Sequence, residues 1–358
     1  MSTGARTGVA HLPLHYGAAP RWLFERMTRL ARQVTLVIVE EFGPQEVLAK
    51  LSDPLWFQAF GCVLGFDWHS SGVTTTVCGA LKEGLRGLEK DSGLFVAGGK
   101  GKTSRKTPQE LELFGDRFGF EPAGLVYASR MAAKVDSAAL QDGYQLYHHT
   151  FVCSGDGAWT VIQQGMNEAT RWARRYHWLS SAVDDFVCEP HSAICSDGRG
   201  VVLNMVAQES DECRDLSARL AGERPDKLVG ELKRLQTLEL PERHQVEASD
   251  IHPDKLAKIF LKTYERQPQD FERLLGMEGV GAKTIRALAL VSELVYGAKA
   301  SVRDPARFSF AHGGKDGHPY PVDRRTYDRS IEALRAAVER AKLGQREKLE
   351  ALRRLAAV

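Results

Sequence analysis

The sequence predicts an α+β protein, in which a mixed α/β domain precedes an all-α domain that carries a helix-hairpin-helix. Two observations lead to this fold class. In the first 210 residues, strand-like apolar runs alternate with amphipathic helical segments. From residue 250 onward, the apolar residues recur at helical spacing. We therefore expect a mixed domain at 1–210, a linker or bridging helix at 211–249 and a helical DNA-binding domain at 250–358.

The mixed domain is expected to begin with helices and to continue as a sheet. Helical periodicity is present at 20–43 and at 45–65. The sequence Ser-Gly-Asp-Gly at 154–157 predicts a hairpin turn, because glycine adopts the backbone angles that such turns need. Residues 167–183 have a helical pattern. The strand-like runs are 94–99, 125–130, 144–152, 159–165 and 201–206.

The composition excludes several classes of protein. The chain has 358 residues, a net charge of +2 and six cysteines, none of them in a CxxC pair. No apolar run approaches the roughly 20 residues of a membrane span, and the first residues lack the apolar core of a secretory signal. We therefore expect a cytoplasmic protein without a membrane partner. Because the isoelectric point is only about 8.2, contacts with nucleic acid must come from local basic clusters or backbone amides.

Residues 271–296 predict a helix-hairpin-helix. Apolar residues end one short helix, a tight turn follows at 279–281, and a second helix begins at Ala282. Two glycines in the turn allow the chain to reverse, and they expose backbone N–H groups at a helix N-terminus, where an anion is favoured. Such a contact with a DNA phosphate positions the protein without reading the base sequence. The expected DNA contacts are Gly279, Val280, Gly281, Lys283 and Thr284.

The segment 274–297 and the Pro-Val-Asp sequence at 321–323 together resemble the helix-hairpin-helix-GPD DNA glycosylases. In that family, Leu-Pro-Gly-Val-Gly-x-Lys-Thr-Ala is followed by a Gly/Pro-rich stretch and then by Pro-Val-Asp. The resemblance implies that Lys283 is the nucleophilic amine and Asp323 the catalytic carboxylate. Some members carry four cysteines after the catalytic region. No cysteine follows Cys213, so we expect no iron–sulfur cluster.

Two other interpretations of these residues stay open. Lysine at this position also occurs in hairpins without catalysis, where Lys283 would simply contact a phosphate. Asp323 could instead cap the helix that follows it.

Polar and aromatic segments spread over the chain carry a second resemblance. They are LPLHYG (12–17), FDWHSSGVTTTVCGALKEGL (66–85), QDGYQLYHH (141–149), WTVIQQGMN (159–167), ARRYHW (173–178) and FAHGGKDGHPYPVDRRTYD (310–328). With these segments, the chain is similar over nearly its full length to a family catalogued as domain of unknown function 763, from archaea and thermophilic bacteria. The resemblance implies a two-part protein with the hairpin at its C-terminal end.

A second candidate site lies in the mixed domain. His69 or His148 could act as a general base or a metal ligand, with Asp136 or Asp142 as its partner. Arg174 and Arg175 lie among aromatic residues, a composition that suits backbone phosphates and base stacking. These residues would make the domain a nuclease, for which a divalent metal is possible. The alternative for each histidine is a buried ring whose hydrogen bonds are satisfied.

These residues favour a DNA-binding enzyme of DNA repair, a DNA glycosylase/AP lyase that acts on damaged or abasic DNA through Lys283 and Asp323. One alternative is a nuclease or strand-processing enzyme with its active site in the mixed domain and the hairpin as DNA anchor. Another is a DNA-binding protein without catalysis. In each case the partner is DNA, contacted chiefly through its phosphate backbone, and no cofactor is firmly predicted. The substrate and the oligomeric state stay open.

Overall fold

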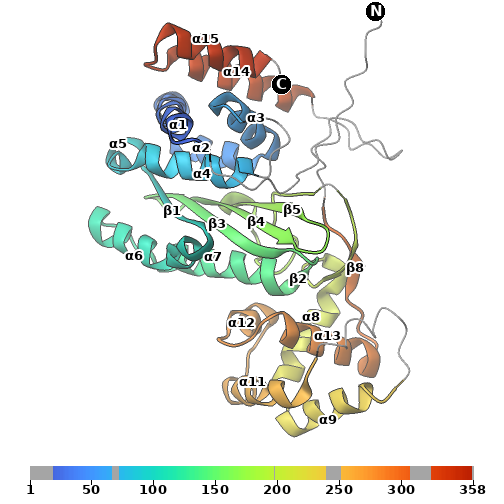
Figure 1. The fold of residues 1–358 in the computed structure, drawn as a ribbon. Coiled ribbons are helices and arrows are strands. Elements are labelled where there is room, and N and C mark those ends of the chain that lie inside the picture. The colour runs from blue at the N-terminus through green and yellow to red at the C-terminus, as the bar shows by residue number, and fades with distance from the viewer. Residues whose placement is uncertain (1–18, 67–71, 197, 239–250, 307–323, 357–358) are drawn as a thin grey trace, which may run out of the picture.

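The computed structural model describes residues 19–66, 72–196, 198–238, 251–306 and 324–356. These residues form a mixed helix-and-sheet structure, which confirms the expected α+β class. A central antiparallel sheet has helices on both faces, and a further group of helices lies below these layers in the view of Figure 1.

The larger sheet has five strands in the order β1-β3-β4-β5-β6, and each neighbouring pair is antiparallel. Gly157, with a φ of +92°, completes the turn between β3 and β4, so the hairpin expected at 154–157 is confirmed. A smaller sheet has the order β2-β7-β8. The strands are β1 (Leu94–Lys100), β2 (Leu140–Gln141), β3 (Gln145–Ser154), β4 (Trp159–Asn167), β5 (Trp172–Leu179), β6 (Ala193–Cys195), β7 (Val201–Asn204) and β8 (Ser301–Arg303).

Helices cover both faces of the larger sheet. On one face, Val96, Val152 and Ile162 share a core with the first four helices. On the other face, Phe151 and Val161 share a core with α7. Because side chains alternate along a strand, neighbouring residues of β3 and β4 belong to different cores. The helices are α1 (Arg21–Phe42), α2 (Pro44–Ser52), α3 (Pro54–Leu64), α4 (Gly72–Leu85), α5 (Glu89–Ser92), α6 (Thr107–Phe118) and α7 (Ala123–Lys134).

Two elements expected in the mixed domain are wrong. Residues 125–130, expected as a strand, belong to α7, whose buried residues recur at helical spacing. Residues 167–183, expected as a helix, contain β5 instead. Every residue of 173–178 is buried, because β5 lies inside the sheet and both its faces are covered. A strand buried on both faces lacks the alternation that identifies a half-buried strand.

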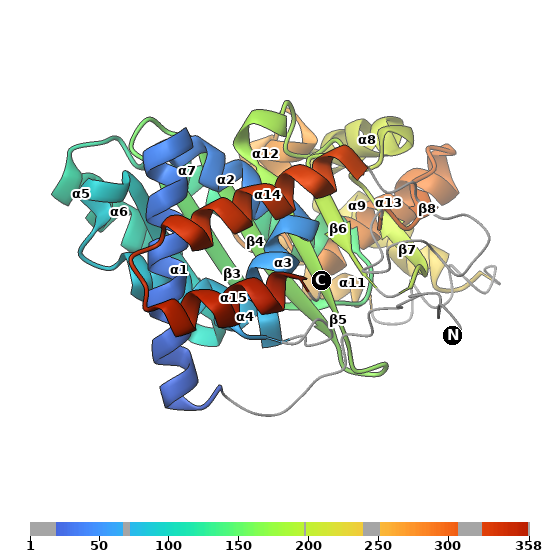
Figure 2. The ribbon, with the colours of Figure 1, turned by 90° about the horizontal axis from the view of Figure 1, so that it is seen from above.

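The last two helices, α14 (Arg324–Arg340) and α15 (Gln345–Ala356), return to the beginning of the chain. Figure 2 shows them lying across α1 and α3. Leu334, Val338 and Ala351 belong to the same core as Met27 of α1. The structure therefore places the last helices with the mixed domain, whereas the sequence pattern grouped them with the hairpin. An amphipathic pattern predicts a buried face but does not identify its partner.

The hairpin belongs to a group of helices that packs beside α7. The first helix of this group lies at Asp211–Ala221, in the segment that we expected to be a linker. It packs against the long second helix of the hairpin. Leu274 and Ile285 of the hairpin share one core with Phe151 of the sheet, so the two parts are continuous in packing. The helices are α8 (Asp211–Ala221), α9 (Pro225–Leu235), α11 (Pro253–Arg266), α12 (Phe271–Gly276) and α13 (Ala282–Tyr296).

Candidate functional site

The hairpin joins α12 to α13 through residues 277–281. Asp270 caps the start of α12 by accepting a hydrogen bond from the backbone N–H of Arg273 at 2.6 Å. Gly279 has a φ of +90°, and a Cβ there would lie 2.8 Å from Cδ1 of Ile259. The backbone angle therefore favours glycine at this position, and an added Cβ would also require the end of the Ile259 side chain to shift.

The start of α13 offers backbone donors. Gly281 is its N-cap residue, and no side chain caps the helix there. Unpaired N–H groups and the helix dipole at such a start favour an anion. Val280 is buried and anchors the turn, while the Lys283 side chain is exposed on the first helical turn. Thr284 is buried, so its hydroxyl does not face a ligand, contrary to the expectation for this residue.

Exposed lysines flank the turn. Ile259 of α11 reaches the turn, and Lys255 and Lys262 lie four residues before and three residues after it. These three residues therefore share one face of α11. Glu278 in the turn is also exposed. Lys255, Lys262 and Lys283 carry three positive charges, and Glu278 carries one negative charge. The net charge of these four residues is therefore +2.

Hydrogen bonds to carbonyl groups hold the turn against the mixed domain. Lys134, the last residue of α7, donates from Nζ to the carbonyl oxygen of Val280 and, at 3.4 Å, to that of Met277. Partial burial lowers the pKa of Lys134. Gln141 donates from Nε2 to the carbonyl oxygen of Ala282 at 2.9 Å. These bonds fix the orientation of the turn relative to the sheet.

A short π-helix, η2 (Val135–Ala139), follows α7 and places Asp136 beneath the larger sheet. Its carboxylate is fully buried and accepts three hydrogen bonds. The donors are Nε2 of Gln163 at 2.5 Å, Nε1 of Trp178 at 3.0 Å and Nε2 of His191 at 2.5 Å. π-Helical turns are rare and frequently lie at functional sites.

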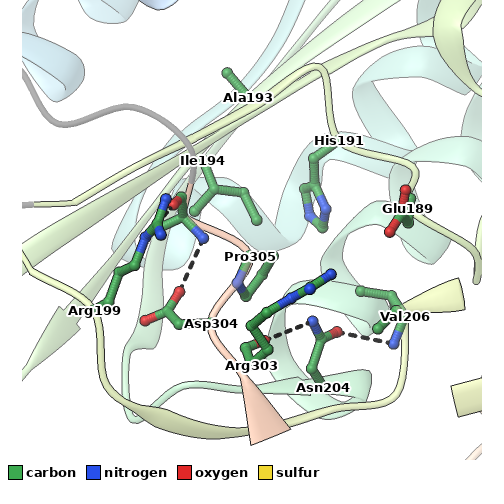
Figure 3. Close-up of a pocket in the computed structure, with 12 residues that line it drawn as sticks. Glu189, His191, Ala193, Ile194, Arg199, Asn204, Val206, Arg303, Asp304 and Pro305 are labelled. Carbon is green, nitrogen blue, oxygen red and sulfur yellow. Dashed lines mark hydrogen bonds between the residues drawn. The ribbon is translucent and has the colours of Figure 1, made fainter. Parts of the chain in front are cut away.

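His191 lies at the wall of a cavity of about 290 Å³. Its side chain is only 6% exposed, and the ring points into the cavity (Figure 3). Its Nε2 is bonded to Asp136, whereas no hydrogen bond joins Nδ1 to any residue that the structure describes. The cavity is lined by Glu189, His191, Ala193, Ile194, Arg199, Asn204, Val206, Ala207, Arg303, Asp304, Pro305 and Ala306.

His148 is not the partner of Asp136. Adjacent strand residues face opposite sides of the sheet, and it is His149 that bonds to Gln163 on the side of η2, at 2.9 Å. On the other side, Nε2 of His148 lies 2.9 Å from Oγ1 of Thr150. Burial lowers the pKa of His148 to about 3, so the ring is neutral near pH 7. Nδ1 of His148 is buried and has no hydrogen-bond partner among the described residues, so the ring is buried as in the structural alternative, but its hydrogen bonds are not all satisfied.

Arg174 and Arg175 are buried, and each is 1% exposed. Arg174 forms ion pairs with Asp142 at 2.9 Å and with Asp304 at 2.7 Å. Arg175 donates to Nε2 of His177 at 2.8 Å. The covered position of β5 explains why neither guanidinium lies where a nucleic-acid backbone could reach it, contrary to the expectation for both residues.

Two of the expected catalytic residues, His69 and Asp323, lie outside the described residues. The pairing of Lys283 with Asp323 therefore stays a prediction. Conversely, no pattern in the sequence indicated His191. The segment 188–192 has no periodicity, and only the contact with a buried carboxylate distinguishes its histidine from the others.

A family model described as "Protein of unknown function (DUF763)" matches residues 8–322. The chain belongs to this family. The match confirms the second resemblance, to domain of unknown function 763, over nearly the full length of the chain. No curated protein and no solved structure matches the chain.

In this member of the DUF763 family, three of the segments that carry the resemblance form the adjacent strands β3, β4 and β5. The register pairs His149 with Gln163, and Gln163 with Tyr176. In a second row, shifted by one residue, His148 pairs with Gln164 and Gln164 pairs with Arg175. Because successive residues face opposite sides, two polar rows cross the sheet back to back. The first row lies on the side of η2.

None of the described helices is both long and apolar enough to cross a membrane. All six cysteines are free thiols, and burial raises the pKa of Cys153 and Cys195 to about 12. Within the described ranges, no three His, Cys, Asp or Glu side chains form a group that could hold a metal ion. The divalent metal that a nuclease could require therefore has no site of this kind among the described residues.

Proposed function

We propose that this protein binds DNA and that the helix-hairpin-helix at 271–296 grips the phosphate backbone. The observation that carries this proposal is the start of α13, which no side chain caps and which lies beside a turn shaped by Gly279. Backbone amides in this position bind a phosphate without recognising the bases. The buried Val280 supports the turn from the core.

The charges around the turn support the same partner. Lys255, Lys262 and Lys283 are exposed near the proposed phosphate, with Glu278 as the opposing charge. We therefore expect an affinity that depends little on base sequence and falls steeply as salt rises, because counterions are released on binding.

The test uses Gly281, whose backbone is extended at a φ of −146° and which has no atom within 4 Å of the position of an added Cβ. A Gly281→Val variant should therefore fold normally, yet its side chain would stand beside the amide that binds the phosphate. Fluorescence anisotropy with a labelled duplex of mixed sequence should show affinity at least about tenfold weaker, because charge-assisted hydrogen bonds contribute about 1.5–3 kcal/mol.

A matched pair of lysines provides the control. Lys283 lies at the first turn of α13, and Lys299 is an exposed lysine beyond its other end. Lys283→Ala should weaken binding and reduce the slope of log affinity against log salt by about one, whereas Lys299→Ala should not. Equal binding by the wild type, Gly281→Val and Lys283→Ala would contradict the proposal. A preference for RNA of the same length would change the partner from DNA to RNA.

The exposed amine of Lys283 favours a narrower proposal, a repair enzyme with DNA glycosylase/AP lyase activity. An amine at this place can reach a sugar that has lost its base and form a Schiff base at C1′. Borohydride should then trap a covalent adduct with abasic DNA. Lys283→Arg keeps the positive charge but cannot form the Schiff base, so it should bind DNA and give no adduct. An adduct that persists in Lys283→Arg would remove Lys283 from the chemistry.

A further inference from the structure

We infer that the cavity beside His191 is an acid–base site for a phosphoester, in which His191 transfers the proton while Arg199 and Arg303 hold the anionic group. The ring of His191 is almost wholly buried, yet it points into the cavity (Figure 3). Most buried side-chain nitrogens are hydrogen-bonded within the protein. In the ring of His191, by contrast, no described residue bonds to Nδ1.

Asp136 determines which nitrogen that is. Its Oδ1 accepts from Nε2 of His191 at 2.5 Å, so in the neutral ring Nε2 carries the hydrogen. Nδ1 is then the nitrogen with the lone pair, on a ring that lies at the cavity wall. Oδ2 of Asp136 accepts from Gln163 and Trp178, so the carboxylate cannot rotate without losing these bonds. Asp136 is thus a positioning residue that would also stabilise the protonated ring.

The cavity wall carries two arginines, Arg199 and Arg303, and two carboxylates, Glu189 and Asp304. Asp304 also lines the cavity, but both its oxygens are occupied by the guanidinium of Arg174 and by the backbone N–H groups of Gly200 and Ala306. Among the described residues, the Arg199 side chain makes one hydrogen bond, from Nε to the carbonyl oxygen of Ala306 at 2.8 Å. The terminal amino groups of Arg199 are therefore available for a bidentate contact with a phosphate.

Arg303 is the second cation. Its side chain is 77% exposed, and its ion pair with Glu209, at 3.9 Å, is weak. Figure 3 shows its guanidinium extending into the space below the ring of His191. Glu189, on the same wall, has a φ of +44°, an unusual value for a residue other than glycine. Backbone strain of this kind concentrates at functional sites.

The proposed step is hydrolysis of a phosphodiester. Nδ1 of His191 removes a proton from a water molecule, and the water oxygen forms a bond to phosphorus. The bond from phosphorus to the leaving oxygen breaks, and His191 returns the proton to that oxygen. The products are a phosphomonoester and an alcohol. This inference rests on the proposed function only in taking the phosphodiester to be that of a nucleic acid. The segment from Lys134 to Asp136 joins the hairpin to this site.

The experiment uses the full chain with two kinds of substrate, labelled DNA and a small chromogenic aryl phosphodiester. His191→Gln keeps an N–H that can donate to Asp136 but cannot transfer a proton. It should lower turnover of both substrates about 10²- to 10⁴-fold, with unchanged affinity for DNA. Arg303→Ala changes an exposed side chain and so should not affect folding. It should weaken binding of inorganic phosphate, followed by the shift of the His191 ring signals in NMR spectra.

The outcomes separate this inference from the proposed function. Hydrolysis of the aryl diester that survives in His191→Gln would overturn the role of His191. Phosphate that leaves the His191 signals unshifted, or that binds without turnover of either substrate, would overturn the acid–base site. Loss of DNA binding in Gly281→Val, with normal hydrolysis of the aryl diester, would support two separate sites. If wild type hydrolyses the aryl diester but does not bind DNA, only the proposed function fails.

Discussion

The hairpin turn at 277–281 and the pair of Asp136 and His191 are reached from one segment, which runs from the end of α7 through η2. The turn is built from backbone groups, and its glycines and lysines are close together in the sequence. The pair is built from buried side chains that are 55 residues apart. Local glycine spacing can therefore indicate the first site, whereas the second exists only because the fold brings distant residues together.

The two regions also differ in what their residues contribute to stability. Asp136 is fully buried and accepts three hydrogen bonds, while Lys283 is exposed. Substitutions at the pair should therefore affect folding and any chemistry together. Truncation of exposed side chains of the hairpin should affect binding alone.

The largest effect is expected from Asp136→Ala. This change leaves the buried N–H groups of Gln163, Trp178 and His191 without their acceptor. We expect the free energy of unfolding to fall by about 3 kcal/mol or more, measured by urea denaturation. Asp136→Asn keeps one acceptor oxygen and should lose less. A loss below about 1 kcal/mol in Asp136→Ala would show that the three bonds are not formed together.

A pH dependence tests the polar row on the opposite face of the sheet. The pKa of His148 is about 3 in the folded protein and near 6.5 when unfolded, so the unfolded chain takes up the proton first as pH falls. The stabilisation is complete above pH 6.5 and is lost toward pH 3, by about 1.4 kcal/mol for each pH unit.

Chemical denaturation at a series of pH values measures this slope. In His148→Gln, the free energy of unfolding should depend less steeply on pH below pH 6.5. Burial also lowers the pKa values of His149 and His177, so their part of the slope remains in the variant. Identical slopes for the wild type and His148→Gln would show that His148 is accessible to protons in the folded protein.

The two glycines of the turn should differ in their tolerance of a side chain. Gly279→Ala adds a Cβ at a φ of +90° and only 2.8 Å from Ile259, so we expect a loss of about 1–3 kcal/mol. Gly281→Ala meets no atom within 4 Å on an extended backbone, and its loss should stay below about 1 kcal/mol. Thermal unfolding of both variants checks this contrast, and equal losses would contradict the turn geometry.

The smallest effect on stability is expected from Lys283→Ala. The side chain is exposed, so the free energy of unfolding should change by no more than about 0.5 kcal/mol. Its effect on DNA affinity should nevertheless be clear at low salt. A large loss of stability would show that Lys283 supports the hairpin structurally instead of facing a ligand.

Much of the fold could be predicted because it depends on local pattern. The helical segments at 20–43 and 45–65 correspond to α1, α2 and α3, and the runs at 94–99 and 159–165 correspond to β1 and β4. The predictions for α7 and β5 were wrong. The apolar run of α7 is short and β5 is buried on both faces, and in both cases the helix and strand patterns look alike. The placement of α14 and α15 could not be predicted, because it depends on which apolar face was left uncovered elsewhere.

The sequence by itself determined the α+β class, membership of the family and the hairpin, since glycine spacing and apolar periodicity are local properties of the chain. Only the tertiary structure decided which polar residues meet. Strand register turned Arg174 and Arg175 inward, separated His148 from Asp136, and brought His191 to that carboxylate. The physical reason is that a side-chain site requires contacts over long sequence distances, and these exist only after the sheet has formed and its two faces have been covered.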